Sequence, residues 1–470
     1  MSYFAELNIK NQLEPENANI IPSGEAILSD LGIEPTKLKS IKPYSKRSQY
    51  KAVVNWITRY KPAIDVSNFE KVRGLIEAFY HLCEVEDWDK AWQILSTDLI
   101  TPMKEELHNQ LYTWGYNQER VNIYKKILDK LLPRLNAFIL NGLGTSYYSL
   151  GDYEAAISYL EQSLKVMQEI QNDQGKMAVF INLANVYDSQ ADYQKVISYQ
   201  KQAMDIAQVI SDHLGESKAL GVLGNISYRL GEFKQASNYY QQALILAQNI
   251  NDTQTEGITL ENLGCLYRVQ GHYDKAIECY EQALVIARKI SDRRLESQIC
   301  GNLGNVYGSI GKYEQAVKYH EYRLDLAQKM KDLLGEATAL RNVGYAYSLL
   351  GEYDKAIKHL KLSLAVAKKI GSSQLEANAL STLGMLLASE GKFSEALKYL
   401  QEGLTICQKI DSCVDEAFIL CTLTKLCLKL GNPNLALEYC DRALSIATKL
   451  DIPLQKECIE LKQKLELLHD

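Results

Sequence analysis

The sequence predicts an all-α fold, a right-handed α-solenoid of stacked antiparallel helix pairs, on three observations. Residues 134–432 contain no proline, and a proline inside a helix costs about 3 kcal/mol. Glycine, alanine and aromatic residues recur along the same run with a regular period, as at Gly264, Gly304 and Gly344. Apolar residues on both sides of each turn recur at i, i+3, i+4 and i+7, which is the pattern of an amphipathic helix.

Residues 1–136 differ in composition from the rest of the chain. All four tryptophans lie there, at Trp56, Trp88, Trp92 and Trp114. We expect residues 1–67 to form an irregular leader and residues 68–136 to form two degenerate helical hairpins. The second hairpin has Gly115 at its turn but Arg120 where the later repeats have alanine. Terminal repeats are expected to be atypical because their outer face meets water.

Eight regular 40-residue repeats are predicted over residues 137–456. The first seven repeats have a glycine, or Ala184, on the first helix, where a larger side chain would hold two helices apart. A second glycine, or Ala191, lies at the turn and supplies the left-handed residue that ends this helix. The turn positions are Gly151, Ala191, Gly231, Gly271, Gly311, Gly351, Gly391 and Gly431. The helix within residues 457–470 is expected to cap the last repeat.

These residues resemble the tetratricopeptide repeat. The family pattern of Leu, Gly and Tyr, then Gly, Tyr and Ala, is present as Leu303, Gly304, Tyr307, Gly311, Tyr313 and Ala316. The 40-residue length is similar to the LGN/Pins and kinesin light chain subtype, and residues 320–347 are especially similar to LGN-type repeats. The leader resembles segments that precede such repeats in cyanobacterial proteins. The resemblance implies a helical superhelix that binds other proteins.

No catalytic, cofactor-binding or metal-binding residues are predicted. A phosphate-binding G-x-x-x-x-G-K-[ST] loop is absent, and His320-Glu321 is not followed by the second histidine of a zinc helix. The cysteines from Cys407 to Cys440 are interpreted as buried core thiols, with metal binding or redox sensing as the alternative. We therefore expect neither an enzyme nor a small-molecule substrate.

The sequence contains no 18-residue uncharged apolar run, and it begins with acidic residues where a signal peptide would be basic and then apolar. A membrane span is therefore not expected. The ten cysteines include no C-x-x-C pair, which favours reduced thiols and a cytoplasmic location.

In tetratricopeptide superhelices the first helix of each hairpin lines the concave groove, and asparagines repeat on these helices here. Five are candidate partner-binding residues: Asn182, Asn185, Asn225, Asn302 and Asn305, with Asn262 and Asn342 at equivalent positions. An asparagine amide both donates and accepts hydrogen bonds, so a row of them could hold the backbone of an extended peptide. The alternative is that they bond to the next hairpin and only support the repeat.

Larger side chains at neighbouring groove positions would give specificity: Tyr228, Arg229, Arg268, Arg341 and Tyr345, with Tyr148 and Glu261. Guanidinium groups form bidentate bonds with carboxylates, so the arginines favour an acidic ligand. Scattered solvent-exposed charge is the alternative. The Lys and Asn of the chaperone-tail carboxylate clamp are not reproduced, because Ile181, Gly221 and Gly301 stand at the first lysine position.

A basic segment spans residues 37–61, with eight Lys or Arg residues and no acidic one. Removing these charges from the formal net charge of −6 leaves −14 for the rest of the chain. Such a segment could attract nucleic acid or an anionic membrane. The simpler interpretation is that it folds back on the acidic repeats or recruits an acidic partner, and nucleic acid is disfavoured by the overall acidic charge.

The function expected from these observations is that of a protein-interaction scaffold or adaptor, which binds a partner peptide or helix in its concave groove. The alternative is a peptide-sensing signalling regulator that acts with a separate effector protein. The sequence does not specify the partner or the oligomeric state.

Overall fold

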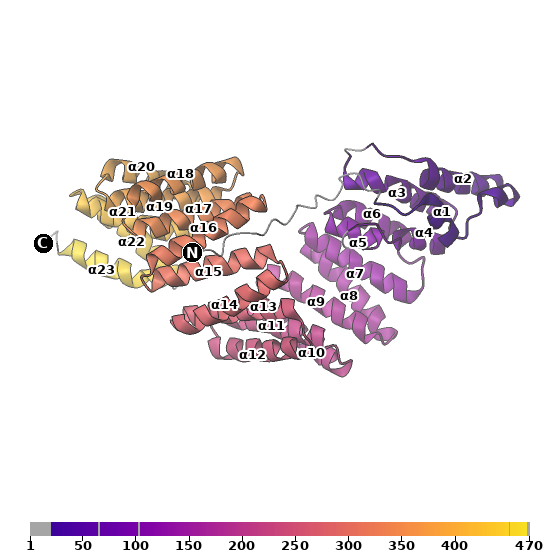
Figure 1. Cartoon of the computed structure of the whole chain (residues 1–470), viewed down its shortest axis with the longest axis horizontal. Helices are drawn as coiled ribbons and strands as arrows, with labels where there is room; N and C mark the ends of the chain where they lie inside the picture. Colours follow the sequence, from indigo (N-terminus) through magenta and orange to yellow (C-terminus); the bar gives the residue numbers. More distant parts are fainter. Residues whose placement is uncertain (1–19, 64–65, 102–103, 451, 468–470) are drawn as a thin grey trace, which may run out of the picture. The chain divides into compact units, whose positions relative to one another are not determined.

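The computed structural model describes residues 20–63, 66–101, 104–450 and 452–467. Every regular element in these ranges is a helix, and consecutive helices pack in pairs (Figure 1), which confirms the predicted all-α class. The chain divides into two compact units, residues 1–223 and 224–470, which are taken in turn below.

The first unit opens with α1 (Gly24–Asp30), the 3₁₀ helix η1 (Pro35–Ser40) and α2 (Tyr44–Arg59). The helices that follow are α3 (Asn68–Glu84), α4 (Trp88–Leu95), α5 (Leu107–Thr113), α6 (Asn117–Ile127), α7 (Pro133–Ser149), α8 (Tyr153–Glu169), α9 (Asp173–Ser189) and α10 (Tyr193–Val209). The unit ends within α11 (His213–Arg229).

The expectation of an irregular leader is wrong for residues 24–30, which form α1, and for residues 44–59, which form α2 and pack against α3. The reason for α2 is that this stretch contains no proline and carries apolar side chains one helical turn apart. Val53 is fully buried and Tyr50 nearly so, and the Tyr50 hydroxyl donates to the Asp87 carboxylate. The basic segment is therefore held by aromatic and aliphatic side chains rather than by its charges. The leader residues 1–19 lie outside the described residues.

The second unit contains the remainder of α11 and the helices up to α23. They are α12 (Phe233–Asn249), α13 (Thr253–Val269), α14 (Tyr273–Lys289), α15 (Arg293–Ser309), α16 (Tyr313–Lys329), α17 (Leu333–Leu349), α18 (Tyr353–Lys369), α19 (Ser373–Ser389), α20 (Phe393–Lys409), α21 (Cys413–Lys429), α22 (Pro433–Leu450) and α23 (Leu454–Glu466). The last helix packs on α22 and α21.

The turn glycines end the first helix of each pair as expected. Gly311 has φ of 76°, and Lys312 N donates to Tyr307 O at 2.9 Å, which closes the helix with the long-range bond of a Schellman turn. Ala191 fills the one gap in the series and adopts φ of 57°. Each pair is thus folded at a single left-handed residue.

A second left-handed residue, which the sequence did not predict, ends the second helix of seven pairs. Only one of these positions is glycine; the series is Gln171, Ser211, Asn251, Ser291, Lys331, Gly371 and Asp411. The next residue begins the following helix and in most pairs caps it. Asp292 Oδ1, for example, accepts from the backbone N–H of Leu295 at 3.0 Å. Both turns of the repeat therefore have fixed backbone conformations.

The first-helix glycines make room for a side chain on the second helix of the same pair. A Cβ on Gly264 would lie 2.5 Å from Tyr280 Cε1, and one on Gly384 would lie 2.5 Å from Leu400 Cγ. Such distances are impossible for packed carbon atoms. The predicted close approach of the two helices is confirmed at these positions.

Candidate functional site

Within each unit the first helices of successive pairs lie next to one another. α7 contacts α9 in the first unit, and in the second unit contacts run from α13 to α15, α17, α19 and α21 in order. Asn182 Nδ2 on α9 donates to Asn141 Oδ1 on α7 at 2.8 Å, and Asn302 Nδ2 on α15 donates to Glu261 Oε1 on α13 at 2.6 Å. We call the solvent-facing side of these adjoining first helices the inner row.

Three of the candidate asparagines use their amides inside the protein. Asn182 and Asn302 make the two bonds just given between first helices, and both are half-buried. Asn225 Oδ1 accepts from the hydroxyl of the buried Tyr240 at 2.7 Å. These contacts are those of a supporting role, the alternative considered from the sequence, and they leave part of each amide for other bonds.

Asn185, Asn305 and Tyr345 occupy the same position in three repeats, and all three are exposed on the inner row. Within the described residues, the amides of Asn185 and Asn305 make no hydrogen bond to protein. Tyr345 exposes 51% of its surface, and Met385 at the next equivalent position exposes 40%. The second unit therefore presents Asn305, Tyr345 and Met385 in succession on neighbouring first helices.

The remaining candidates are distributed along the same helices. Arg229 is exposed, and Asn262, Asn342 and Tyr228 are half-buried, with Tyr228 against the ring of Phe233. Tyr148 shares a hydrogen bond of 3.1 Å with Ser189 on the next first helix. Burial raises the pKa of the Glu261 carboxyl. Arg268 is half-buried, and its Nε has no partner among the described residues.

Arg341 on α17 belongs to a cluster of two arginines and one histidine that sequence reasoning missed. The other members are Arg323 and His320 on α16. His320 is 4% exposed and packs on Gly304, whose Cβ would lie 2.5 Å from His320 Cε1. Arg323 packs on Gly301, whose Cβ would lie 2.7 Å from Arg323 Nη1. Two glycines one turn apart on α15 thus make room for the His320 ring and the Arg323 guanidinium, one turn apart on α16.

The two arginines of this cluster repel one another and are partly buried, which disfavours their charged forms. Burial, then the charge of Arg341, lowers the pKa of Arg323, and burial lowers the pKa of Arg341. The pKa of His320 falls to about 4 because the ring is buried beside both arginines. Arg323 Nε, Arg341 Nε and His320 Nδ1 are buried without a hydrogen-bond partner in the described part of the chain. Asp332 and Asp415 offset the two charges only through space.

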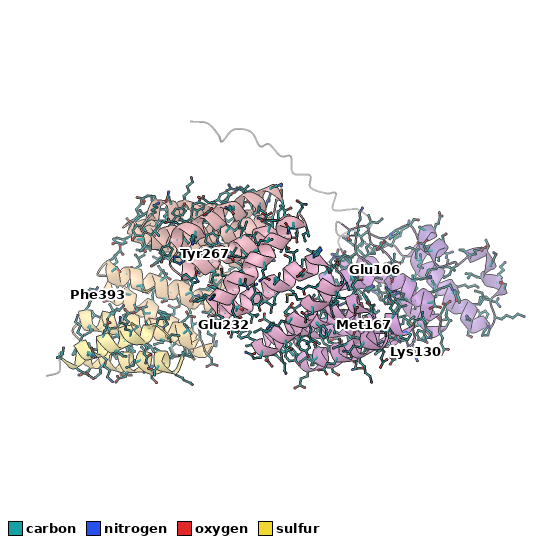
Figure 2. All side chains as sticks on the ribbon, turned by 90° about the horizontal axis from the view of Figure 1, so that it is seen from below. Glu106, Lys130, Met167, Glu232, Tyr267 and Phe393 are labelled. Atoms are coloured by element: carbon teal, nitrogen blue, oxygen red, sulfur yellow. The ribbon has the colours of Figure 1, made fainter. Side chains whose placement is uncertain are left out.

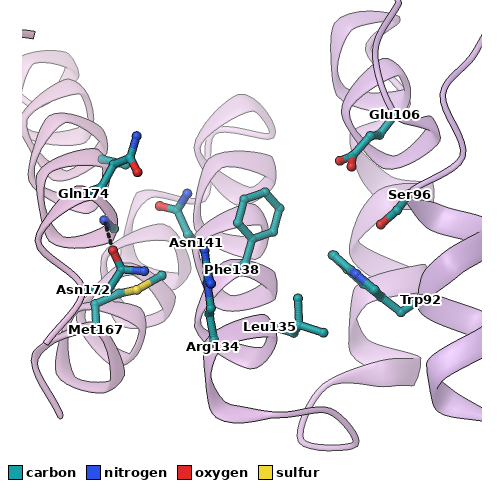
Figure 3. Close-up of a pocket in the computed structure, with 12 residues that line it drawn as sticks. Trp92, Ser96, Glu106, Arg134, Leu135, Phe138, Asn141, Met167, Asn172 and Gln174 are labelled. Atoms are coloured by element: carbon teal, nitrogen blue, oxygen red, sulfur yellow. Dashed lines mark hydrogen bonds between the residues drawn. The ribbon is translucent and has the colours of Figure 1, made fainter. Parts of the chain in front are cut away.

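The first unit has a pocket of about 510 Å³ where the degenerate hairpins meet the first regular repeats. Trp92, Leu135 and Phe138 form one side, with Phe138 39% exposed (Figure 3). Asn141, Asn172 and Gln174 supply amides on the other side (Figure 3). Glu106 and Met167 also line the pocket, and both are labelled in Figure 2. The combination of apolar walls and a few amides suits an apolar side chain of a peptide.

The Trp92 side of the pocket is held in place by the buried residues His108 and Tyr124. The buried His108 ring stacks on Trp92 with centroids 5.3 Å apart, and it is held between Glu106 Oε2 at 2.7 Å and Tyr124 OH at 2.9 Å. Burial lowers the pKa of His108. Sequence reasoning missed this pocket, because its residues come from the irregular hairpins as well as from the 40-residue pattern.

All ten cysteines are free thiols, and burial raises the pKa of most of them, including Cys421 to about 12. Such thiols are poor nucleophiles at neutral pH. Among the described residues, no group of three or more His, Cys, Asp or Glu side chains could hold a metal ion. None of the described helices is long and apolar enough to cross a bilayer.

The Tetratricopeptide repeat family matches this sequence in overlapping segments: residues 135–208, 176–249, 215–289, 255–329, 293–369, 335–409 and 375–449. The chain belongs to the tetratricopeptide repeat family. Together these segments of tetratricopeptide repeats cover residues 135–449, well over half of the chain. Proteins built of these repeats generally bind other proteins or regulate them rather than catalyse reactions. None of the curated proteins matches the sequence.

Solved structures with tetratricopeptide-like folds are similar to this one. The apo form of RapI has a TM-score of 0.56 and 13% identity over 81% of this chain and 98% of RapI. The apo form of the quorum sensor NprR from B. thuringiensis has a TM-score of 0.55 and 15% identity over 81% of this chain and 99% of NprR. A signal transduction ATPase with a tetratricopeptide repeat sensor, from Pyrococcus horikoshii, has a TM-score of 0.54 and 16% identity over 94% of this chain and 65% of that protein. At these identities the likeness establishes the fold alone.

Proposed function

We propose that this protein is a non-enzymatic adaptor that holds a peptide or helical segment of a partner protein on the inner row. The observation that carries this proposal is the set of exposed side chains repeated on adjoining first helices. Asn185 and Asn305 have amides that make no hydrogen bond within the described residues and can bond to the backbone of a ligand, and Tyr345 offers an exposed aromatic face. In the second unit, a ligand lying across α15, α17 and α19 would meet the exposed Asn305, Tyr345 and Met385 in turn.

The other candidates have distinct parts in this proposal. Asn182, Asn225 and Asn302 hold the helices in register and offer only their remaining hydrogen-bond capacity. Tyr228, Arg229, Arg268 and Arg341 would select side chains of the ligand, and the arginines favour an acidic partner over nucleic acid. The pocket beside Phe138 would receive an apolar side chain from a ligand bound to the first unit.

The test is binding of the purified protein to a library of 12-residue peptides of random sequence. We expect Asn305→Ala to lose about fivefold in affinity for the selected peptides that bind the second unit, and Asn185→Ala to lose as much for those that bind the first unit, since each change removes one backbone-directed hydrogen bond. The melting temperatures of both variants should stay nearly unchanged. Val285→Ala is the control, because Val285 is 67% exposed on a second helix, α14. Loss of stability without a specific loss of binding would assign these asparagines to a structural role.

A peptide-sensing regulator that acts with a separate effector is the second candidate. It is favoured by the likeness in fold to the quorum sensor NprR and to an ATPase that has a tetratricopeptide repeat sensor. A sensor should change its solution dimensions when a selected peptide binds, whereas a scaffold should keep them. Small-angle X-ray scattering with and without peptide distinguishes the two.

We also propose a cytoplasmic location, which the ten free thiols support. The resemblance to LGN/Pins, kinesin light chain and cyanobacterial repeats is kept as a proposal about subtype. It depends on residues 320–347 and on the leader sequence.

A further inference from the structure

Arg323 on α16 is larger than the equivalent residues of the other repeats, and it carries a charge that they lack. The equivalent residue of the second helix is small in the seven other repeats: Ser163, Ala203, Ala243, Ala283, Ser363, Gly403 and Ala443. A small residue at this position is therefore sufficient for the packing of a repeat. The guanidinium fits only because Gly301 lacks a side chain on α15. Gly221 stands at the equivalent position of an earlier repeat, but only this repeat combines the glycine with an arginine and so seats a charge where the others have a small residue.

This arrangement costs stability. A half-buried guanidinium with an unpartnered Nε loses hydration without gaining a hydrogen bond. A second arginine, Arg341, occupies on α17 the position that Gly301 occupies on α15, and α16 packs on both helices. The charge of Arg341 opposes that of Arg323, and neither arginine forms an ion pair with the described residues. Natural sequences break their own local rules mostly at functional sites. An anion between the two guanidinium groups would relieve the repulsion and satisfy the free N–H donors.

We propose that Arg323 and Arg341, with His320 beneath them, form a subsite in the second unit that binds a carboxylate of the peptide ligand. The proposal deepens the adaptor function and rests on it. Asn305 lies one turn beyond Gly301 on the same helix, so a peptide whose backbone contacts Asn305 can place a carboxylate at Arg323. The carboxylate can come from an Asp or Glu side chain or from the C-terminus of the ligand, since both offer the two oxygens that a guanidinium binds side by side.

Three short probes separate these sources. Acetyl-Ala-Glu-Ala-amide has only a side-chain carboxylate, acetyl-Ala-Ala-Ala has only a terminal one, and acetyl-Ala-Gln-Ala-amide has neither. We expect one or both carboxylate probes to raise the melting temperature of the wild type at constant ionic strength, and the glutamine probe to leave it unchanged. Arg323→Ala should abolish the rise. Equal effects of all three probes, or equal rises in wild type and variant, would overturn the proposal.

The variant also carries an internal check on folding. Because alanine is the residue of four other repeats at this position, Arg323→Ala should melt at the same temperature as the wild type or higher. A lower melting temperature would make Arg323 a packing residue and count against the subsite. Arg442→Ala is the matched control, since Arg442 Nη2 already pairs with Glu416 Oε1 at 3.1 Å; it should keep the full response to the probes.

The peptide library separates this proposal from the adaptor function. Peptides selected by the wild type should bind Arg323→Ala about tenfold more weakly, and changing their Asp or Glu to the amide should have the same effect. Selected peptides that bind equally well after either change would overturn the carboxylate subsite and leave the adaptor function standing. Absence of any selected peptide would instead defeat the adaptor function, whereas the short probes still decide whether the two arginines bind a carboxylate.

Discussion

Single glycines decide how closely the two helices of a repeat approach. Gly264 accepts the ring of Tyr280 and Gly304 accepts that of His320, so each glycine is matched to one side chain on the second helix of its own pair. Gly221 differs, because nothing lies within 4 Å of the Cβ it would carry. The glycines of the first helices therefore fall into two kinds, those that a neighbour requires and those that lower helix stability without a packing benefit.

Substitution by alanine should separate the two kinds. Gly264→Ala places a Cβ against Tyr280 and should destabilise the protein by about 1–3 kcal/mol through overpacking. Gly221→Ala should stabilise it by up to about 1 kcal/mol, because alanine is the better helix former. Chemical denaturation of both variants beside the wild type measures this. Destabilisation of equal size in the two would refute the distinction.

His320 should make stability depend on pH in a predictable direction. Its pKa is about 4 in the folded protein and near 6.5 in an unfolded chain. Between these values the unfolded state binds more protons, so stability falls as the pH falls through this window. From pH 6.5 to pH 5 the loss from His320 is about 1.5 kcal/mol.

The variant His320→Leu removes this proton from both states, and leucine is the residue of three other repeats at this position. Urea unfolding at pH 7, 6 and 5 should therefore show the variant losing less stability than the wild type on acidification. Parallel curves for the two proteins would show that His320 takes up its proton at the same pH whether folded or not.

At the scale of elements, most helix pairs are bounded by two left-handed residues. After the first helix this residue is almost always glycine, whereas after the second helix it is a polar residue in every such pair but one. The polar residues accept a conformation that costs non-glycine residues about 1–2 kcal/mol. The cost is partly offset because the turn holds the next residue, such as Asp292, at the start of a helix that it caps.

Glycine at such a position should be stabilising. Ser291→Gly should raise the free energy of unfolding by about 0.5–1 kcal/mol, since glycine adopts positive φ without steric cost but has more freedom to lose on folding. The reverse change, Gly371→Ser, should lower it by a similar amount. Thermal or chemical denaturation of the pair gives the answer; changes of the same sign in both variants would contradict it.

These elements also show what could be predicted from the sequence. The helix pairs and the first turns follow from glycines and apolar residues that repeat in register. The second turns could not be predicted, because their left-handed residues are Gln, Ser, Asn, Lys and Asp as well as glycine. No single residue type marks this position. Helix α2 was missed since prolines flank it and basic residues crowd it. Asn185, Asn305 and Tyr345 were located on the exposed inner row by their period, whereas Arg323 was overlooked because specificity was sought only on first helices.

For the whole molecule, stability should be a sum of local contributions, because the main helix contacts are with the next one or two helices along the chain. Leu383→Ala should therefore act near its own repeat. Leu383 is fully buried on α19, and its truncation should cost about 2–5 kcal/mol. Hydrogen exchange followed by mass spectrometry should show faster exchange in α17–α20 and unchanged exchange in α3–α6. An equal increase in both regions would mean that the two units unfold as one.

Because the repeats are regularly spaced, the residues of the proposed arginine subsite can be placed at the equivalent positions of a neighbouring repeat. Its residues come from one helix pair and the first helix that follows, and every neighbouring pair offers the same backbone positions with no insertion or deletion between them. The subsite could be moved forward by one repeat with Arg341→Gly, Leu360→His, Ser363→Arg and Ser381→Arg, because Gly344 already occupies the remaining position; Arg341→Gly removes the original subsite at the same time. A protein of this design can change the ligand that it recognises by substituting side chains within one repeat, without altering the helix pairs that carry them.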